Sequence, residues 1–336
     1  MKEFFKNEDL VFQSKQYPRH WISENLKGFT FLSKVVTRYV GASCLFCAAL
    51  LASSCQDDLP TNGDTDNGQQ TLKVKVYNNA FDDNETKAIV TGTTFPANSE
   101  IGLTVAESAK TTYDGQTYNN LLYKLSSGSW SSSSKVYLSN TAGTVYAYYP
   151  YSSSVTDITA VPIQASSDKD YMYAKTTATV SNTNPTATLG MAHAMAAVTV
   201  KMTKGTYTGA GSVTGLTWQS TSAAKSAKLN AKTGALANIT GANEAFDSGL
   251  TSTNKTTLAA QSQYLFLVVP AGTSGALSFT MNMDGQTYTA QSAAVQLKAG
   301  YKYDYTLQIK GAQMTVSSVT ITDRVDNGRE TINPSI

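Results

Sequence analysis

The chain has little cysteine and histidine for its 336 residues, and it has no apolar run long enough to span a membrane. The three cysteines are Cys44, Cys47 and Cys55, and the two histidines are His20 and His193. The residues after Cys55 therefore form no disulfide with one another, and they offer few of the ligands that transition metals prefer. We expect a fold stabilised by burial alone, with no metal site and no cofactor.

A large charge of one sign is also absent. The chain has 26 Lys and Arg residues and 24 Asp and Glu residues, and residues 1–54 hold seven of the basic and four of the acidic ones. The small positive charge thus belongs to the N-terminal segment, and the rest of the chain is close to neutral. This balance gives no indication of a nucleic-acid partner.

Residues 1–54 have the pattern of a secretory signal. Lys34 and Arg38 precede about a dozen apolar or small residues, and the run ends in small residues from Ala52 to Ser54. A permanent membrane helix needs about 20 apolar residues. The pattern therefore predicts export followed by removal of the segment.

Cys55 stands directly after these small residues, as in the signal of bacterial lipoproteins, which it resembles. The resemblance implies that the Cys55 thiol carries lipid, including palmitate, and becomes the mature N-terminus; the alternative is simple cleavage near Ala52. Gln56, Asp57 and Asp58 resemble the surface-export signal of Bacteroides lipoproteins. Together these resemblances imply an outer-membrane lipoprotein exposed on the cell surface.

Residues 55–70 are polar, with Leu59 the one aliphatic residue among them, and this composition predicts a flexible tether. After the tether, apolar residues alternate with polar ones in a period of two, which is typical of half-buried strands. The clearest alternating segments are 72–77, 198–203, 278–283 and 301–309. We expect an all-β chain.

Prolines and Asp-Gly pairs indicate where strands end. Segments 145–149 and 264–269 are apolar on both faces and stop at Pro150 and Pro270, which predicts central strands. Asp-Gly pairs at 114–115 and 284–285 favour two-residue hairpin turns. The Ala- and Lys-rich segment 222–237 has some helical character, but Lys232-Thr233-Gly234 favours a turn there.

The alternation is interrupted near Asn182, Asn184 and Pro185. This break predicts two tandem β-sandwich domains, residues 71–187 and 188–336, after the leader of residues 1–54 and the tether of residues 55–70.

The sequence contains no recognisable catalytic motif. Gly209, Gly211 and Gly215 miss the dinucleotide-binding spacing, and no nucleophile elbow or phosphate loop is present. His193 lies among small apolar residues at an expected strand start, so we interpret it as a packing residue. We therefore predict that the protein is not an enzyme, and we keep a secreted hydrolase as an alternative.

Two other groups of residues are considered as binding sites, one for calcium and one for sugars. Asp82, Asp83 and Glu85 lack the ordered spacing of a calcium loop, and a solvated connector is the simpler interpretation. Trp130 and Trp218, with 19 tyrosines in the chain, offer aromatic faces suited to sugar rings. Tyrosine is also an ordinary strand residue, so these rings equally fit a packed sheet.

Six short motifs occur in order along residues 72–310: Thr86-Lys87-Ala88, Thr94-Phe95 with 100–103, Tyr146–Tyr151, Asp170–Ala174, His193–Val198 and Leu297–Tyr305. Together they resemble the fimbrillin family of Bacteroides-type lipoproteins. Where that family often has a tryptophan near its C-terminus, this chain has Arg324-Val325.

The resemblance implies a fimbrial (pilus) subunit with a role in adhesion, whose partners are other fimbrial subunits, the outer membrane and an adhesion ligand. Family members are two-domain β-sandwich proteins that a trypsin-like protease trims, and a strand from a neighbouring subunit then fills the groove. The alternative is a surface glycan-binding lipoprotein of a nutrient-uptake system, which shares the anchor and the β-rich composition.

Two segments fit the resemblance. Lys87 follows the expected strand 72–77 and a polar stretch, so cleavage between Lys87 and Ala88 would separate that strand from the body. Lys73, Lys75 and Lys110 are competing sites. Segment 313–322 has the character of a donor strand, because its apolar residues alternate on either side of a register shift at Ser317-Ser318; they are Met314, Val316, Val319 and Ile321.

Overall fold

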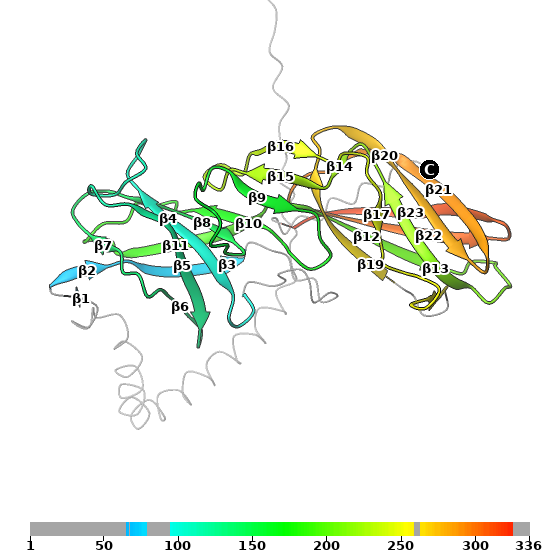
Figure 1. Ribbon diagram of the computed structural model, residues 1–336, viewed down its shortest axis with the longest axis horizontal. Helices are drawn as coiled ribbons and strands as arrows, with labels where there is room; N and C mark the ends of the chain where they lie inside the picture. Colours follow the sequence, from blue (N-terminus) through cyan, green and yellow to red (C-terminus); the bar gives the residue numbers. More distant parts are fainter. Residues whose placement is uncertain (1–64, 67, 79–94, 259–262, 325–336) are drawn as a thin grey trace, which may run out of the picture. The chain divides into compact units, whose positions relative to one another are not determined.

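The computed structural model describes residues 65–66, 68–78, 95–258 and 263–324 (Figure 1). These residues contain no α-helix, and none of them forms a helix long and apolar enough to cross a membrane. The regular elements are β-strands, which confirms the all-β prediction. The secretory signal, Cys55 with Gln56, Asp57 and Asp58, and the Lys87-Ala88 bond lie outside the described residues.

The N-terminal part of the chain builds a seven-stranded sheet, whose strand order is β3-β11-β10-β8-β4-β5-β6. In that order the strands are Lys73–Asn78, Thr186–His193, Met172–Lys175, Thr144–Tyr149, Glu100–Ala106, Tyr118–Ser126 and Ser129–Ser131. Beside it lies a small sheet with the order β1-β2-β7, formed by Thr65–Asp66, Gln69–Thr71 and Tyr137–Leu138. The end of the expected tether is therefore in strands.

The C-terminal part builds two five-stranded layers. One has the order β14-β19-β12-β22-β23, formed by Ala223–Ala224, Gln263–Pro270, Ala196–Thr203, Tyr301–Lys310 and Gln313–Asp323. The other has the order β17-β13-β20-β21, with β18 also paired to β13; its strands are Phe246–Asp247, Ser212–Gln219, Ser274–Met283, Gln286–Gln296 and Thr256–Thr257. Apolar residues of both layers form one core cluster around Trp218, Phe279 and Tyr305.

A fifth sheet joins segments from the two parts. Its order is β16-β15-β9, formed by Leu236–Thr240, Ser226–Leu229 and Val161–Gln164. Strand β9 precedes the C-terminal layers by some 30 residues, yet it pairs antiparallel with β15. Ile163, Leu229 and Leu267 belong to the core cluster beneath this sheet, so residues from both parts of the chain share it.

The domain boundary expected between residues 187 and 188 falls inside a strand. The break at Asn182, Asn184 and Pro185 is a turn, closed by the bridge between Ser181 and Asn184, and it leads into β11. Because β11 pairs with β3 and β10, it belongs to the N-terminal sheet. The change from N-terminal to C-terminal sheet comes instead between β11 and β12, at residues 194–195.

Most local predictions agree with the structure. Strands β8 and β19 end at or beside Pro150 and Pro270, and each lies between two paired neighbours. Asp114 and Asp284 have φ values of 50° and 47°, and the glycines that follow them are also in the left-handed region, as hairpin turns require. Residues 222–237 form β14, β15 and the first residues of β16 rather than a helix.

Candidate functional site

Strand β3 is the first candidate, because it lies at the edge of the N-terminal sheet. It pairs in parallel with β11 from Lys73 opposite Thr186 to Asn78 opposite Met191. No other described strand is hydrogen-bonded along its second edge. The amide of Leu72 donates to Val136 O at 2.9 Å, and that of Lys73 donates to Pro185 O at 2.8 Å. These contacts hold the start of β3 in place.

The inner face of β3 completes an apolar core. Val74 of β3 and Leu72, which directly precedes the strand, are each 8 % exposed, and they pack in one cluster with Leu189 and Met191 of β11, which are fully buried. Burial of an aliphatic side chain of this size contributes about 1.5–3 kcal/mol. Loss of β3 would therefore expose both an apolar groove and the unpaired edge of β11.

The outer face of β3 is exposed to solvent. Lys73 and Lys75 are exposed, and Tyr77 is 45 % exposed, which is unusual for an aromatic residue in this structure. Both lysines lie within a paired strand. A protease needs an extended and detachable segment, so the peptide bonds after these lysines are poor substrates.

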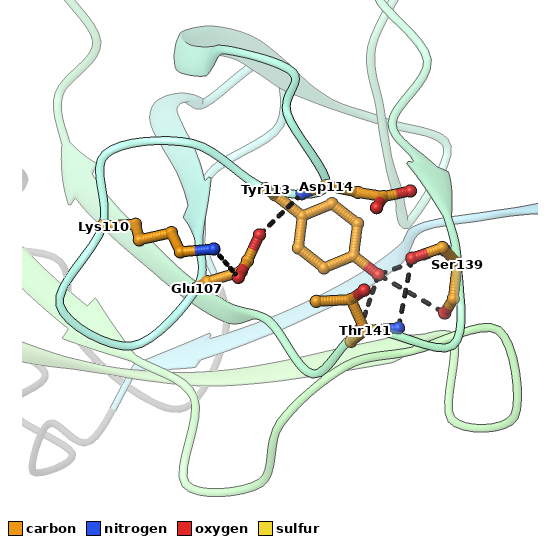
Figure 2. Close-up of polar contacts among 6 residues, drawn as sticks. All are labelled: Glu107, Lys110, Tyr113, Asp114, Ser139 and Thr141. Atoms are coloured by element: carbon orange, nitrogen blue, oxygen red, sulfur yellow. Dashed lines mark hydrogen bonds and ion pairs between the residues drawn. The ribbon is translucent and has the colours of Figure 1, made fainter.

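Lys110, the third competing cleavage site, lies in a tightly bonded turn (Figure 2). Its ammonium contacts Glu107 Oε2 at 2.6 Å, and the amide of Asp114 donates to Glu107 Oε1 at 3.0 Å. Beside them Tyr113 is fully buried, and its hydroxyl donates to Thr141 O at 2.8 Å. These contacts fix residues 107–114 against the neighbouring loop, which disfavours cleavage after Lys110.

Strand β23 is the second candidate and also an edge strand. It forms a long antiparallel hairpin with β22, from Lys310 opposite Gln313 to Tyr301 opposite Asp323. The register shifts between Thr306 and Leu307, because Ser317 is an extra residue whose hydroxyl donates to Thr306 O at 3.1 Å. The predicted register shift at the two serines is a β-bulge.

The side chains of β23 are buried unevenly. Met314, near the hairpin turn, is 6 % exposed and belongs to the C-terminal core. Val316, Val319 and Ile321 are only half-buried, and the last two line a cleft of about 390 Å³ that also includes Val295 of β21. The sheet thus buries the N-terminal end of this strand but holds its C-terminal end less tightly.

Three charged or titratable side chains meet just beyond the end of β23. Arg324 Nη2 lies 2.5 Å from Asp170 Oδ2, and His193 Nδ1 lies 2.9 Å from the same oxygen. All three side chains are buried, with exposures of 0 % for Asp170 and His193 and 5 % for Arg324. The backbone amide of Arg324 also donates to Gly300 O at 2.6 Å.

The register of the N-terminal sheet explains how two of these residues meet. His193 is the last residue of β11 and lies opposite Met172 of β10, so Asp170, two residues earlier, lies beside the imidazole. His193 therefore ends a strand and has charged partners, contrary to the expected strand start among small apolar neighbours. Its interpretation as a buried structural residue stays a prediction.

The cluster is close to electrically balanced. Burial by itself would raise the pKa of Asp170, but the Arg324 guanidinium and His193 hold that pKa at about 2. Burial lowers the pKa of His193; Asp170 opposes this effect, and Arg324 adds to it. At neutral pH the arrangement is thus an Asp170–Arg324 ion pair with a neutral imidazole beside it.

This cluster was not found from the sequence. Asp170 and His193 occur in two of the six motifs, but no pattern in the sequence links them to Arg324, which is 154 residues from Asp170. The one signal in the sequence is a basic residue, Arg324, just after the alternating segment 313–322. His193 Nε2 is buried and has no hydrogen-bond partner among the described residues, so the Asp–His pair lacks the hydroxyl of a hydrolase triad.

Trp130 and Trp218, the tryptophans among the described residues, do not form an exposed platform for sugar rings. Trp218 is 1 % exposed and stacks on Phe246 with ring centroids 4.5 Å apart. Trp130 is half-buried and packs edge-on against Phe95. Tyr148 is also buried, and its hydroxyl donates to Asn120 Oδ1 at 2.7 Å. The described residues contain no cluster of three metal-binding side chains either.

Comparison with known protein families finds a match over most of the chain. The model of the family described as fimbrillin-like, Mfa_like_1, matches residues 86–323, a range that starts at the predicted cleavage segment and ends with β23. Comparison with curated proteins finds none that matches.

Solved structures of cell adhesion proteins are similar in fold, and two of them illustrate the likeness. A candidate cell adhesion protein from Bacteroides ovatus is 18 % identical, with a TM-score of 0.57 over 77 % of this chain and 100 % of its own. Another, from Bacteroides uniformis, is 20 % identical, with a TM-score of 0.56 over 76 % of this chain and 99 % of its own. At this identity the likeness concerns the fold.

Proposed function

Since the chain belongs to the fimbrillin-like family, we propose that it is a surface-exposed fimbrial subunit with a role in adhesion, which polymerises by strand exchange. In this proposal Cys55 carries the lipid anchor, and Gln56, Asp57 and Asp58 direct the protein to the outside of the outer membrane. Its partners are further copies of the chain or related fimbrial subunits.

The observation that supports exchange is the pair of edge strands β3 and β23. Strand β3 is six residues long, lies at a sheet edge and covers apolar residues of β11. Cleavage between Lys87 and Ala88 would leave it attached to the body by noncovalent contacts alone. Once it leaves, the groove offers unpaired backbone groups and an apolar floor, and an added strand satisfies both.

Strand β23 has the length and pattern of the incoming strand. It has 11 residues, more than the six of β3, and Met314 with Val316 or Val319 with Ile321 repeats the spacing of Leu72 with Val74. Because it is an edge strand, its withdrawal leaves the pairs among β14, β19, β12 and β22 intact. In the exchange β23 therefore loses its edge pairing with β22 and gains an edge pairing with β11 of a neighbouring subunit.

Limited trypsin digestion of a soluble form that begins at Gln56 tests the proposal. We expect a new N-terminus at Ala88 together with oligomers that resist dilution, and neither product from Lys87→Gln. Monomers after complete cleavage at Lys87 would contradict strand exchange.

A reversible disulfide identifies the donor. Thr306 and Ser318 are register partners on β22 and β23, and the soluble form has no other cysteine, so Thr306→Cys with Ser318→Cys links only these strands. The oxidised variant should be cut at Lys87 but stay monomeric, and reduction should restore oligomers. Oligomers in the oxidised state would show that β23 is not the donor.

A further inference from the structure

The two ends of β23 are held in different ways. At its N-terminal end the hairpin turn at Gly311 and Ala312 connects it covalently to β22, and Met314 packs in the core. At its C-terminal end the described residues show no turn to a neighbouring strand, and Val319 and Ile321 are half-buried. An edge strand with one closed end opens from the other, because fewer contacts must break there.

Arg324 holds the C-terminal end of β23 in place. It follows the last residue of β23 directly, and its guanidinium reaches Asp170, which comes from the N-terminal part of the chain. Its amide bond to Gly300 adds a second contact, and Gly300 in turn donates to Met195 O at 2.9 Å. Val319 and Ile321 therefore lie between the bulge at Ser317 and a buried ion pair.

We infer that Arg324 and Asp170 form a latch that keeps β23 in its own sheet, and that this ion pair must separate before β23 can pass to another subunit. The inference rests on the proposed function for the second step, although the first is a property of the single chain. Arg324 is thus a positioning residue, because it acts through the strand it ends.

A buried ion pair suits this role for a physical reason. Once one partner is removed, the other is left as an uncompensated charge in a dry site, so the pair resists partial opening. When the strand end leaves as a whole, both groups reach water and recover their hydration. The pair therefore favours two states, closed and fully open, over a frayed intermediate.

Hydrogen exchange of the soluble form from Gln56 onward tests the latch without polymerisation. In Arg324→Gln the amides of residues 318–323 should exchange about a hundredfold faster than in the unaltered protein. Amides of β21, which is also an 11-residue edge strand, should keep their rates. Arg324→Lys keeps the charge and should restore most of the protection.

Two controls separate a latch from general stability. Thr320→Ala changes an exposed residue of β23 and should leave exchange unaltered. If Arg324→Gln does not fold, Asp170→Asn provides the second variant, with the same local increase expected. An acceleration in β21 equal to that in β23, or no acceleration in β23, would overturn the latch.

Polymerisation then tests the second step. After cleavage at Lys87, Arg324→Gln should form oligomers at least tenfold faster than the unaltered protein, since β23 opens more often. If the unaltered protein forms no oligomers at all, the proposed function fails, while the exchange result still decides whether the latch exists. Equal rates of oligomer formation in both proteins would show that opening of the ion pair does not limit transfer.

Discussion

Strands β3 and β12 make the same kind of pairing in the two parts of the chain, but their surroundings differ. Each is the first long strand of its part, and each pairs in parallel with a later strand, β3 with β11 and β12 with β22. Strand β12 is also paired with β19 on its other side, whereas β3 has no second hydrogen-bonded strand among the described residues.

This difference shows which strand the fold can lose. Removal of β12 would split its sheet into β14-β19 and β22-β23, whereas removal of β3 leaves β11, β10, β8, β4, β5 and β6 paired as before. A parallel pairing between distant segments has an entropic cost, because the chain between them must lose conformational freedom before the contact can form. When such a pair lies at the edge of a sheet, the edge strand can leave while the other strands stay paired. The comparison predicts three effects of decreasing size.

The largest effect concerns the ion pair that joins the two parts. Asp170→Ala leaves Arg324 charged and buried, so we expect a loss of about 3–5 kcal/mol in the free energy of unfolding. The double variant Asp170→Leu, Arg324→Met removes both charges and should recover most of that loss. Urea unfolding of the unaltered protein, Asp170→Leu, Arg324→Met and the double variant measures the coupling; additive losses would mean that the two residues do not interact.

The second effect compares the two parallel strands directly. Val198 in β12 is fully buried and Val74 in β3 is 8 % exposed. Val198→Ala should destabilise the protein by about 2–3 kcal/mol and Val74→Ala by about 1–2 kcal/mol, because an edge site collapses more easily around the missing methyl groups. Denaturant midpoints test this, and Tyr77→Ser on the exposed face of β3 is the control, with a change within about 0.5 kcal/mol. A larger loss from Val74→Ala than from Val198→Ala would refute the comparison.

The smallest effect is a pH dependence that originates at His193. Burial lowers the pKa of His193 in the folded protein, so the unfolded chain binds the proton more readily and stability falls as the pH drops below about 6.5. Asp170, whose pKa is about 2, adds a further loss below about pH 4. His193 is the one histidine after residue 54, so His193→Gln should flatten the stability curve between pH 7 and pH 5. Equal slopes in both proteins would exclude His193 as the source.

Local patterns in the sequence predicted a large share of this fold. The alternation along residues 301–309 corresponds to β22, the Asp-Gly pair at 284–285 forms the β20–β21 hairpin, and the two serines at 317–318 mark the bulge of β23. Each feature depends on the backbone conformation of a few neighbouring residues, so nearby side chains determine it.

The boundary between the two parts was predicted less well, for a related reason. Asn182, Asn184 and Pro185 favour a turn, and they form one, but a turn within a sheet and a linker between domains have the same local chemistry. Only the pairing of the residues that follow distinguishes them. In this chain β11 returns to β3, 113 positions earlier, and so belongs to the N-terminal sheet.

The sequence by itself thus determined the class of the fold and the position of most strands and turns. Tertiary structure decided which strands lie at edges and that Asp170, His193 and Arg324 meet in a buried cluster. The edge position of β3 beside β11 and the Asp170–Arg324 ion pair depend on contacts between residues more than a hundred positions apart. Such contacts are selected by the shared burial of the whole core, and no short pattern along the chain encodes them.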